Sequence, residues 1–212
     1  MSISVCILNY LGTGVLHKVV ESVKRQTRKP DEIIVVDNGC PYSSWRIVEK
    51  DVDRVVHADN EYQFITGLNV AFQEAKSDHV LFMENDVLLH GNCLNEMFYD
   101  GGDITNPILY DPMGNRHFTT PFCFLTACFM MKKSTFDFVG DFDKNLAPAY
   151  YEDVDYSVRA RKFGFTIKKD VGKAVHLANW SFSKVYSKPA MSQMCKKNFR
   201  YLLKKHLLKK LA

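Results

Sequence analysis

The first 86 residues alternate between short apolar runs and segments with helical periodicity. A helix is expected between the first two runs, where apolar residues recur at three- and four-residue spacing, and another over residues 67–75. Strands that alternate with helices form parallel crossovers, with helices on both faces of the sheet. The sequence therefore predicts an α/β fold with a central, mostly parallel sheet. Its first four strands are expected at residues 3–10, 31–39, 54–59 and 79–86.

The alternation weakens after residue 100. Residues 122–133 are expected to form one long apolar strand, and residues 150–164 a helix that ends at Gly164. Two further short strands are expected at residues 165–170 and 173–177. This part of the chain extends the sheet without repeating the pattern of the first part.

The chain has 212 residues, enough for one sizeable core, and contains no linker rich in proline, glycine or serine. We expect one domain over residues 1–190 and a basic amphipathic helix over residues 191–212. Net charge is +4, and lysines crowd into this last segment. Three interpretations fit its basic face: a packed helix whose lysines face solvent, a junction to a further domain, or a helix that binds anionic lipid. We favour a packed helix, and binding to nucleic acid is not expected because few aromatic residues are interleaved.

The six cysteines form no CxxC pair, and several lie in apolar runs. This pattern favours reduced, packed thiols over a disulfide framework or a zinc site. The N-terminus leads almost directly into the first apolar run, without the pattern of a secretion signal. A cytoplasmic location is therefore expected.

Polar residues stand where several predicted strands end. Asn9, Asp37 and the Glu84-Asn85-Asp86 segment all occupy such positions. The carboxyl ends of parallel strands meet at one edge of a sheet, which is where α/β proteins bind ligands. Two carboxylates one residue apart are costly to desolvate unless water, a proton or a cation compensates them. The sequence therefore predicts a polar, ligand-binding edge.

Three segments in this order, "QTRKPDEIIVVDNG", "FMENDVLL" and "YYEDVDYSVRARKFGF", resemble the family 2 glycosyltransferases. These are inverting enzymes of the GT-A fold, and the resemblance covers roughly residues 2–182. It implies transfer of a hexose from a nucleoside-diphosphate sugar, with a UDP-sugar favoured, to a hydroxyl of a glycan acceptor. It also implies Mn²⁺ or Mg²⁺ as cofactor.

The resemblance carries over to single residues on the donor side. Asp37 matches the aspartate that binds the uracil or ribose, although Asp-Asn-Gly alone is also a turn signal. Asp86 matches the last acid of the DxD motif, which binds the metal. The first acid is here Glu84, a departure from the motif, and its contact could be with the metal, through water, or with the ribose. His176 matches a histidine that completes the metal site or contacts the diphosphate, against the alternative of a structural histidine.

The segment after the third strand also departs from the family, which often has Asn-Leu-Gly-Phe where this chain has Glu-Tyr-Gln-Phe. Gln63 and Asn69 are candidates for donor binding, or else for capping the helix. Asn9 and Asn85 are further candidates at the predicted sheet edge. Thr126 is a candidate for lining the acceptor side.

The third segment supplies the general base. The resemblance assigns Asp153 to this role, with Glu152 beside it: one carboxylate must deprotonate the attacking hydroxyl. Acidic residues also suit the start of a helix, where they face its dipole. Asp155 is expected to have only this structural role at the start of the helix, and to form a surface ion pair with Arg159 at i,i+4 spacing.

Three other functions remain as alternatives. A sugar-nucleotide pyrophosphorylase would carry a glycine-rich loop with an arginine after the first strand, and "LNYLGTGVLHK" lacks that arginine. A non-catalytic nucleotide-sugar or glycan-binding module would tolerate the change to Glu84. A glycosidase also uses two carboxylates, but it needs no nucleotide-binding signals.

Overall fold

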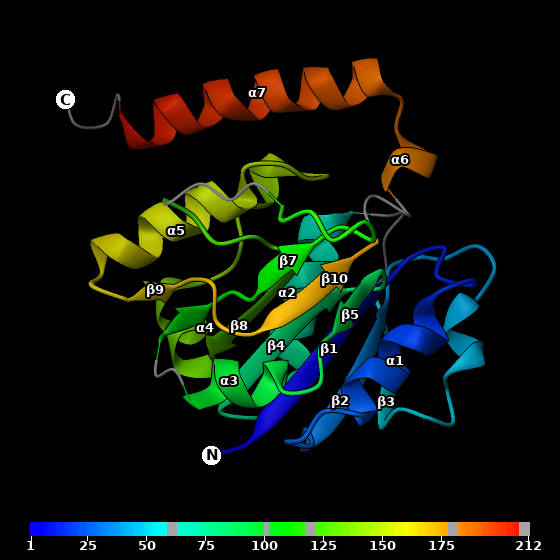
Figure 1. Cartoon of the computed structure of the whole chain (residues 1–212). Coiled ribbons are helices and arrows are strands. Elements are labelled where there is room, and N and C mark those ends of the chain that lie inside the picture. Colours follow the sequence, from blue (N-terminus) through cyan, green and yellow to red (C-terminus); the bar gives the residue numbers. More distant parts are fainter. Residues whose placement is uncertain (59–62, 100–101, 118–121, 178–181, 208–212) are drawn as a thin grey trace.

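The structure, a computed structural model, describes residues 1–58, 63–99, 102–117, 122–177 and 182–207 (Figure 1). Its main sheet has seven strands in the order β3-β2-β1-β4-β8-β6-β9. Strands β3, β2, β1 and β4 run parallel, whereas β8 is antiparallel to both β4 and β6. The predicted central, mostly parallel sheet is confirmed. The strands are β1 (Ile3–Asn9), β2 (Glu32–Asp37), β3 (Arg54–His57), β4 (His79–Glu84), β6 (Ile104–Thr105), β8 (Cys128–Lys132) and β9 (Ile167–Lys168).

A second, three-stranded sheet in the order β5-β10-β7 was not expected from the sequence. Its strands are β5 (Val87–Leu89), β7 (Ile108–Tyr110) and β10 (Lys173–His176). β10 runs antiparallel to β5, with His176 opposite Val87. This pairing brings the end of β10 beside the turn that follows β4.

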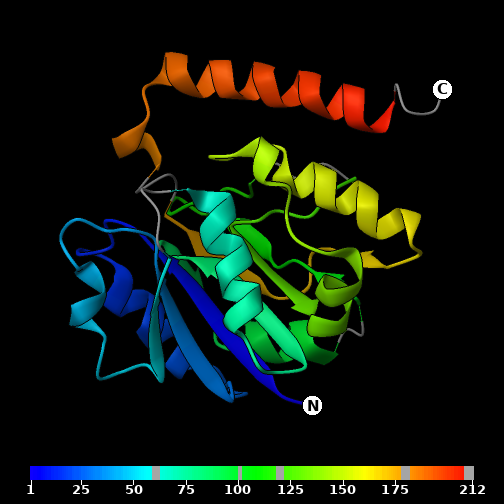
Figure 2. The same cartoon turned by 180° about the vertical axis from the view of Figure 1, so that it is seen from behind.

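Helices cover both faces of the main sheet, with α1 and α2 on opposite sides (Figures 1 and 2). The helix predicted at residues 67–75 begins three residues earlier, at Phe64. The α-helices are α1 (Leu16–Lys24), α2 (Phe64–Glu74), α3 (Cys93–Tyr99), α4 (Lys133–Val139), α5 (Glu152–Lys162), α6 (Phe182–Val185) and α7 (Lys188–His206). Two short 3₁₀ helices are η1 (Ser44–Ile47) and η2 (Lys144–Leu146).

The core consists of two apolar layers, one on each face of the main sheet. In β1, Cys6 and Leu8 pack towards α2, while Val5 and Ile7 pack towards α1 and the smaller sheet. Successive side chains of a strand point to opposite faces, so a strand buried on both sides is apolar throughout. This explains why β1, β2 and β4 are continuous apolar runs in the sequence.

The long strand predicted over residues 122–133 is shorter in the structure, because β8 begins at Cys128. The side-chain amide of Asn106 bonds to backbone groups just before β8 and at its first residue. It donates to the carbonyls of Leu125 and Cys128, at 2.9 and 2.6 Å, and accepts from the Leu125 N–H. Those groups are therefore not free for a sheet ladder. Thr126 lies in the resulting turn, where its hydroxyl can reach α5.

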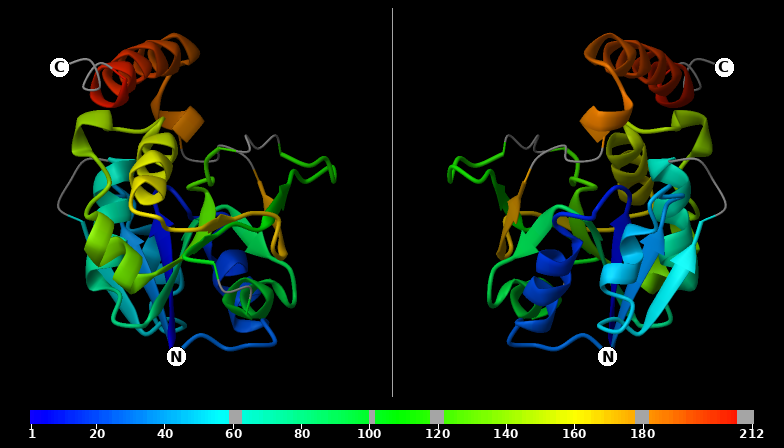
Figure 3. Two further views of the ribbon diagram at one scale, coloured as in Figure 1. Left: turned by 90° about the vertical axis from the view of Figure 1, so that its left-hand side faces the viewer. Right: turned by 90° about the vertical axis from the view of Figure 1, so that its right-hand side faces the viewer.

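The C-terminal helix α7 begins at Lys188, three residues before the predicted start, and the Ser187 hydroxyl accepts from the Ala190 N–H at its first turn. It lies over α5 at one end of the molecule (Figure 3). Asn198 and Leu202 are buried against the domain. The helix is thus packed, with Lys196 and Lys204 exposed on its outer side, and the predicted end at residues 208–212 lies outside the described residues.

All six cysteines are free thiols, and five of them are buried, as the sequence predicted. Within the described ranges, no helix combines the length and the apolar character that crossing a bilayer requires.

Candidate functional site

The register of the main sheet aligns the polar residues at the ends of its parallel strands. Asn9 lies opposite Asp37 across the β1–β2 pair, and Leu8 lies opposite Glu84 across the β1–β4 pair. The residues that the sequence placed at strand ends therefore share one edge of the sheet.

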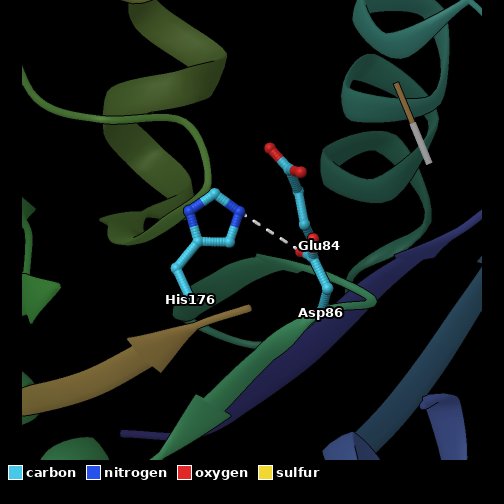
Figure 4. Close-up of side chains that lie close together, drawn as sticks. All are labelled: Glu84, Asp86 and His176. Carbon is cyan, nitrogen blue, oxygen red and sulfur yellow. Dashed lines mark ion pairs between the residues drawn. The ribbon is translucent and has the colours of Figure 1, made fainter. Parts of the chain in front are cut away.

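Glu84, Asp86 and His176 form a cluster at this edge (Figure 4). One ligand atom from each lies within 4.8 Å of the others, and His176 Nε2 is 3.3 Å from Asp86 Oδ1. Glu84 ends β4 and Asp86 stands in the tight turn before β5, while His176 ends β10, which pairs with β5. The small sheet thus brings together residues about 90 positions apart in the chain.

The cluster is electrostatically strained without a cation. Burial, with the charge of the neighbouring Asp86, raises the pKa of Glu84 to about 7. Burial acts to lower the pKa of His176, but the Asp86 hydrogen bond and the Glu84 charge outweigh it, so the pKa rises. Two carboxylates and an imidazole in a buried setting are donors that suit a divalent cation, which would compensate the two acids.

Glu152 and Asp153 begin α5. The Glu152 carboxylate is buried and accepts a 2.7 Å hydrogen bond from the Thr126 hydroxyl. Burial, with Asp153 beside it, raises the pKa of Glu152 to about 8. Burial also raises the pKa of Asp153, to about 6, although its carboxylate accepts from the Val154 N–H at 2.7 Å. Of the two acids, Asp153 is the one that is ionised at neutral pH.

Two members of the cluster and the acid pair line one cleft. This cavity, of about 280 Å³, is lined by Glu84 and His176 and by Glu152 and Asp153. The remaining walls include the apolar Phe64, Leu109 and Leu125 and the aromatic Tyr150 and Tyr151.

Asp37 lies two strands from β4 and does not line this cleft. Its Oδ2 is 3.2 Å from Nδ1 of His57, and its Oδ1 accepts from the Cys40 N–H at 3.3 Å. The ring of Trp45 contacts His57 edge-on, with centroids 5.1 Å apart. Neither His57 nor Trp45 stands in a sequence motif, so sequence reasoning missed both residues.

Asn9 and Asn85 contact other protein groups at this edge of the sheet. Both are buried, and the Asn85 amide donates to Asn9 Oδ1 at 3.0 Å and to the Tyr10 carbonyl at 2.8 Å. Asn9 in turn donates to the Ser44 hydroxyl at 2.9 Å. A Cβ on Gly12 would lie 2.3 Å from Asn9 Oδ1, so only glycine fits against this pair. Together they fix the turn that presents Asp86.

Asn69 is also bonded to other protein groups. It is 1% exposed, and its amide both donates to the Phe142 carbonyl and accepts from the Phe142 N–H, at 3.0 and 2.8 Å. Gln63 is exposed at the start of α2 and accepts from the Thr66 hydroxyl at 3.3 Å, without capping the helix. Gln63 therefore stays a candidate, whereas Asn69 holds a loop.

The predicted ion pair of Asp155 with Arg159 forms, but it is not on the surface, because Asp155 is completely buried. Its carboxylate contacts Arg159 at 2.9 Å, and Lys205 and His206 of α7 at 2.7 Å each. The partners from α7 are about 50 residues away in sequence, so spacing within α5 could not reveal them.

His117 was missed by sequence reasoning. It lines the cleft, its ring centroid is 5.2 Å from that of His176, and burial lowers its pKa. It stands in an irregular segment after β7, where no periodicity points to a site.

Comparison with known proteins agrees with this architecture. Residues 2–100 match the family model described as "Glycosyl transferase family 2". A search of curated proteins finds no match. Crystal structures of S. aureus TarS (17% identity, TM-score 0.69) and of GalNAc-T7 with UDP, GalNAc and Mn²⁺ (14% identity, TM-score 0.70) each align with 83% of this chain. S. aureus TarS 1-349 in complex with UDP-GlcNAc aligns with 93% of it, at 17% identity and TM-score 0.69.

The chain covers only part of these structures: 36% of the first, 44% of the second and 66% of the third. The structural likeness shows the shared GT-A fold. The family model covers 99 of the 212 residues, and the cluster of Glu84, Asp86 and His176 has the donor set of a divalent metal site.

Proposed function

From the family 2 match and the geometry of the cleft, we propose that this chain is a metal-dependent, inverting hexosyltransferase that uses a UDP-sugar as donor and a glycan hydroxyl as acceptor. The observation that carries the proposal is that Glu84 and His176, which cluster with Asp86, line the same cavity as Asp153. The TarS structure with UDP-GlcNAc and the GalNAc-T7 structure with UDP and Mn²⁺ support the choice of donor and of metal.

Glu84, Asp86 and His176 would hold Mn²⁺ or Mg²⁺. When bound, such a cation neutralises the charge that develops on the leaving diphosphate. The carboxylates supply hard oxygen ligands and His176 a nitrogen ligand, a mixture that suits Mn²⁺ somewhat better than Mg²⁺. Asp37, with His57 and Trp45 beside it, would bind the nucleoside by accepting a hydrogen bond from the uracil or ribose.

Asp153 acts as the general base. It takes the proton of the acceptor hydroxyl as the oxygen forms a bond to the anomeric carbon, while the bond from that carbon to the diphosphate oxygen breaks on the opposite face. The product sugar is therefore inverted, and the proton passes from Asp153 to solvent. Glu152, kept protonated by burial and bonded to Thr126, adds no second negative charge beside this base.

We also propose a cytoplasmic location, which the free thiols support, since they are typical of a reducing compartment.

The proposal is tested by incubating the chain with a panel of UDP-, GDP- and dTDP-sugars, with Mn²⁺, with Mg²⁺ and with chelator. Hydrolysis or transfer from a UDP-sugar that stops in chelator is the expected result. Turnover that is indifferent to metal contradicts the metal site. Calorimetric binding of UDP with Mn²⁺ but no turnover with any acceptor would instead assign a non-catalytic binding module.

A further inference from the structure

Two tyrosines directly before the acid pair have an unusual backbone conformation. Tyr150 and Tyr151 have φ angles of 79° and 71°. Bulky residues rarely adopt the left-handed region, and they persist there only where the surrounding structure enforces it. Both side chains line the cleft, and Tyr151 is the N-cap residue of the helix that carries Glu152 and Asp153. Whatever holds this turn also sets where Asp153 points.

Asn198 of the C-terminal helix holds the Tyr150–Tyr151 turn in place. Its side chain is 1% exposed, and its amide nitrogen lies 2.7, 2.9 and 3.0 Å from the carbonyl oxygens of Leu146, Ala149 and Tyr150. Three carbonyls converge on one point, and carbonyls only accept hydrogen bonds, so the group that faces them must be a donor. A buried amide nitrogen meets this need where a carboxylate or an apolar side chain cannot.

The same helix also holds the chain on the other side of the acid pair. Lys205 bridges Asp143 and Asp155, at 2.6 and 2.7 Å, and His206 contacts Asp155 at 2.7 Å. Asp155 lies two residues after Asp153 on α5. Glu152 and Asp153 are therefore flanked by two attachments to α7, and Figures 1 and 3 show this helix lying along α5.

We propose that Asn198 of α7 is a positioning residue for Asp153 and that it acts through the strained Tyr150–Tyr151 turn. This inference rests on the proposed role of Asp153 as base. Without Asn198, the turn loses its shared donor and relaxes towards negative φ, which moves Asp153 and the tyrosine rings that line the cleft. The residues of the metal cluster stand on β4, its turn and β10, so donor binding is spared.

The test compares Asn198→Leu, similar in size but without donors, with Tyr201→Phe. Tyr201 stands on the same helix and donates a 2.8 Å hydrogen bond to Asp143, so its variant weakens helix docking without touching the turn. If Asn198→Leu does not fold, Asn198→Ser, which keeps one donor, replaces it in the comparison. For each protein, kcat, the donor KM and backbone hydrogen exchange over residues 147–155 are measured.

We expect Asn198→Leu to lower kcat by about 10- to 100-fold, as misplacement of a catalytic group does, with donor KM unchanged and faster exchange confined to residues 147–155. Asn198→Ser should fall between this variant and the wild type, and Tyr201→Phe should match the wild type. The inference is overturned if an Asn198 variant keeps the wild-type kcat, or if Tyr201→Phe loses as much. Should the wild type itself turn over no donor, the proposed function fails, and the exchange measurement still decides whether Asn198 holds the turn.

Discussion

The hydroxyl of Thr126 donates a 2.7 Å hydrogen bond to Glu152, the buried acid directly before Asp153. The Glu152 carboxylate accepts this bond, and burial together with Asp153 raises its pKa to about 8. Burial raises the pKa of Asp153 only to about 6. Acids whose environments push their pKa values apart are typical of sites where one is neutral and the other acts as a base.

The first prediction concerns the dependence of kcat on pH. Because the pKa of Asp153 is raised to about 6, its neutral form dominates below that pH, and neutral Asp153 accepts no proton. We expect kcat at saturating donor to be low at pH 5 and to rise with pH, reaching half its plateau near pH 6. The measurement is initial rate between about pH 5 and 8 with Mn²⁺ held constant. A rate that is flat over this range, or that falls as pH rises through 6, argues against Asp153 as the base.

The second prediction is that Asp153→Asn abolishes transfer and stabilises the fold. Losing a general base lowers kcat by roughly 100-fold or more, while UDP binding is kept. An acid whose pKa is raised on folding destabilises the folded state at pH 7, where it must ionise while buried. The amide removes that cost, so we expect the free energy of unfolding to increase by about 1–2 kcal/mol. Thermal melts and UDP calorimetry measure both effects.

The matched control for this substitution is Asp137→Asn. Asp137 pairs with Lys133 on the exposed surface of α4 and does not line the cleft. We expect it to leave kcat unchanged and to shift stability by less than about 0.5 kcal/mol. If Asp153→Asn lowers UDP affinity instead of kcat, Asp153 is a donor-binding residue.

Some of the site followed from the sequence because it depends on local pattern. Continuous apolar runs predicted buried parallel strands, and a parallel sheet places all their carboxyl ends at one edge. Asp37, Glu84 and Asp86 could therefore be assigned to that edge from spacing alone. Whether a side chain at the edge faces a ligand or the protein is a different matter, because it depends on what packs above the strand.

The asparagines illustrate this limit. Asn9, Asn69 and Asn85 have the residue type and the positions of ligand contacts, yet each amide bonds to other protein groups. Those groups include a hydroxyl 35 residues away and a backbone 73 residues away. A sequence pattern with a period of two or 3.6 residues carries no information over such separations.

The pairing of β5 with β10 and the burial of Asp155 have the same origin. β5 has three residues, and its partner follows more than 80 residues later, so no local pattern announces a second sheet. Asp155 and Arg159 have the spacing of a surface pair, and only the arrival of α7 makes the pair internal. Contacts between residues far apart in the chain therefore determine both the second sheet and the burial of Asp155, and local sequence patterns do not predict them.

The third prediction concerns the metal. His176→Ala removes one of three ligands, and we expect the affinity for Mn²⁺ in the presence of UDP to fall by about 10- to 100-fold. Calorimetric titration of Mn²⁺ measures this directly. His17→Ala, an exposed histidine on α1, is the control and should leave the affinity unchanged. Equal Mn²⁺ affinity in both variants would remove His176 from the metal site and leave it as a partner of Asp86.

The last prediction concerns the attachment of α7 to α5. Burial alone would raise the pKa of Asp155, but the hydrogen bond from Lys205 and the charge of Arg159 outweigh it and lower the pKa. An acid whose pKa is lowered on folding adds stability above its unfolded pKa of about 4, and this stability is lost as pH falls through the lower folded value. Lys205 therefore stabilises the fold at pH 7 and contributes less at low pH.

Lys205→Met should lower the free energy of unfolding by about 2 kcal/mol at pH 7, because it leaves the buried Asp155 with fewer partners. The loss should shrink below about pH 4, as Asp155 becomes protonated in the unfolded and then in the folded protein. Urea unfolding at both pH values measures the difference. Lys204→Met is the control, since Lys204 is the exposed neighbour on the same helix and should cost less than about 0.5 kcal/mol. Equal losses in the two variants, or a loss for Lys205→Met that is the same at both pH values, would show that the Lys205–Asp155 pair does not carry the attachment.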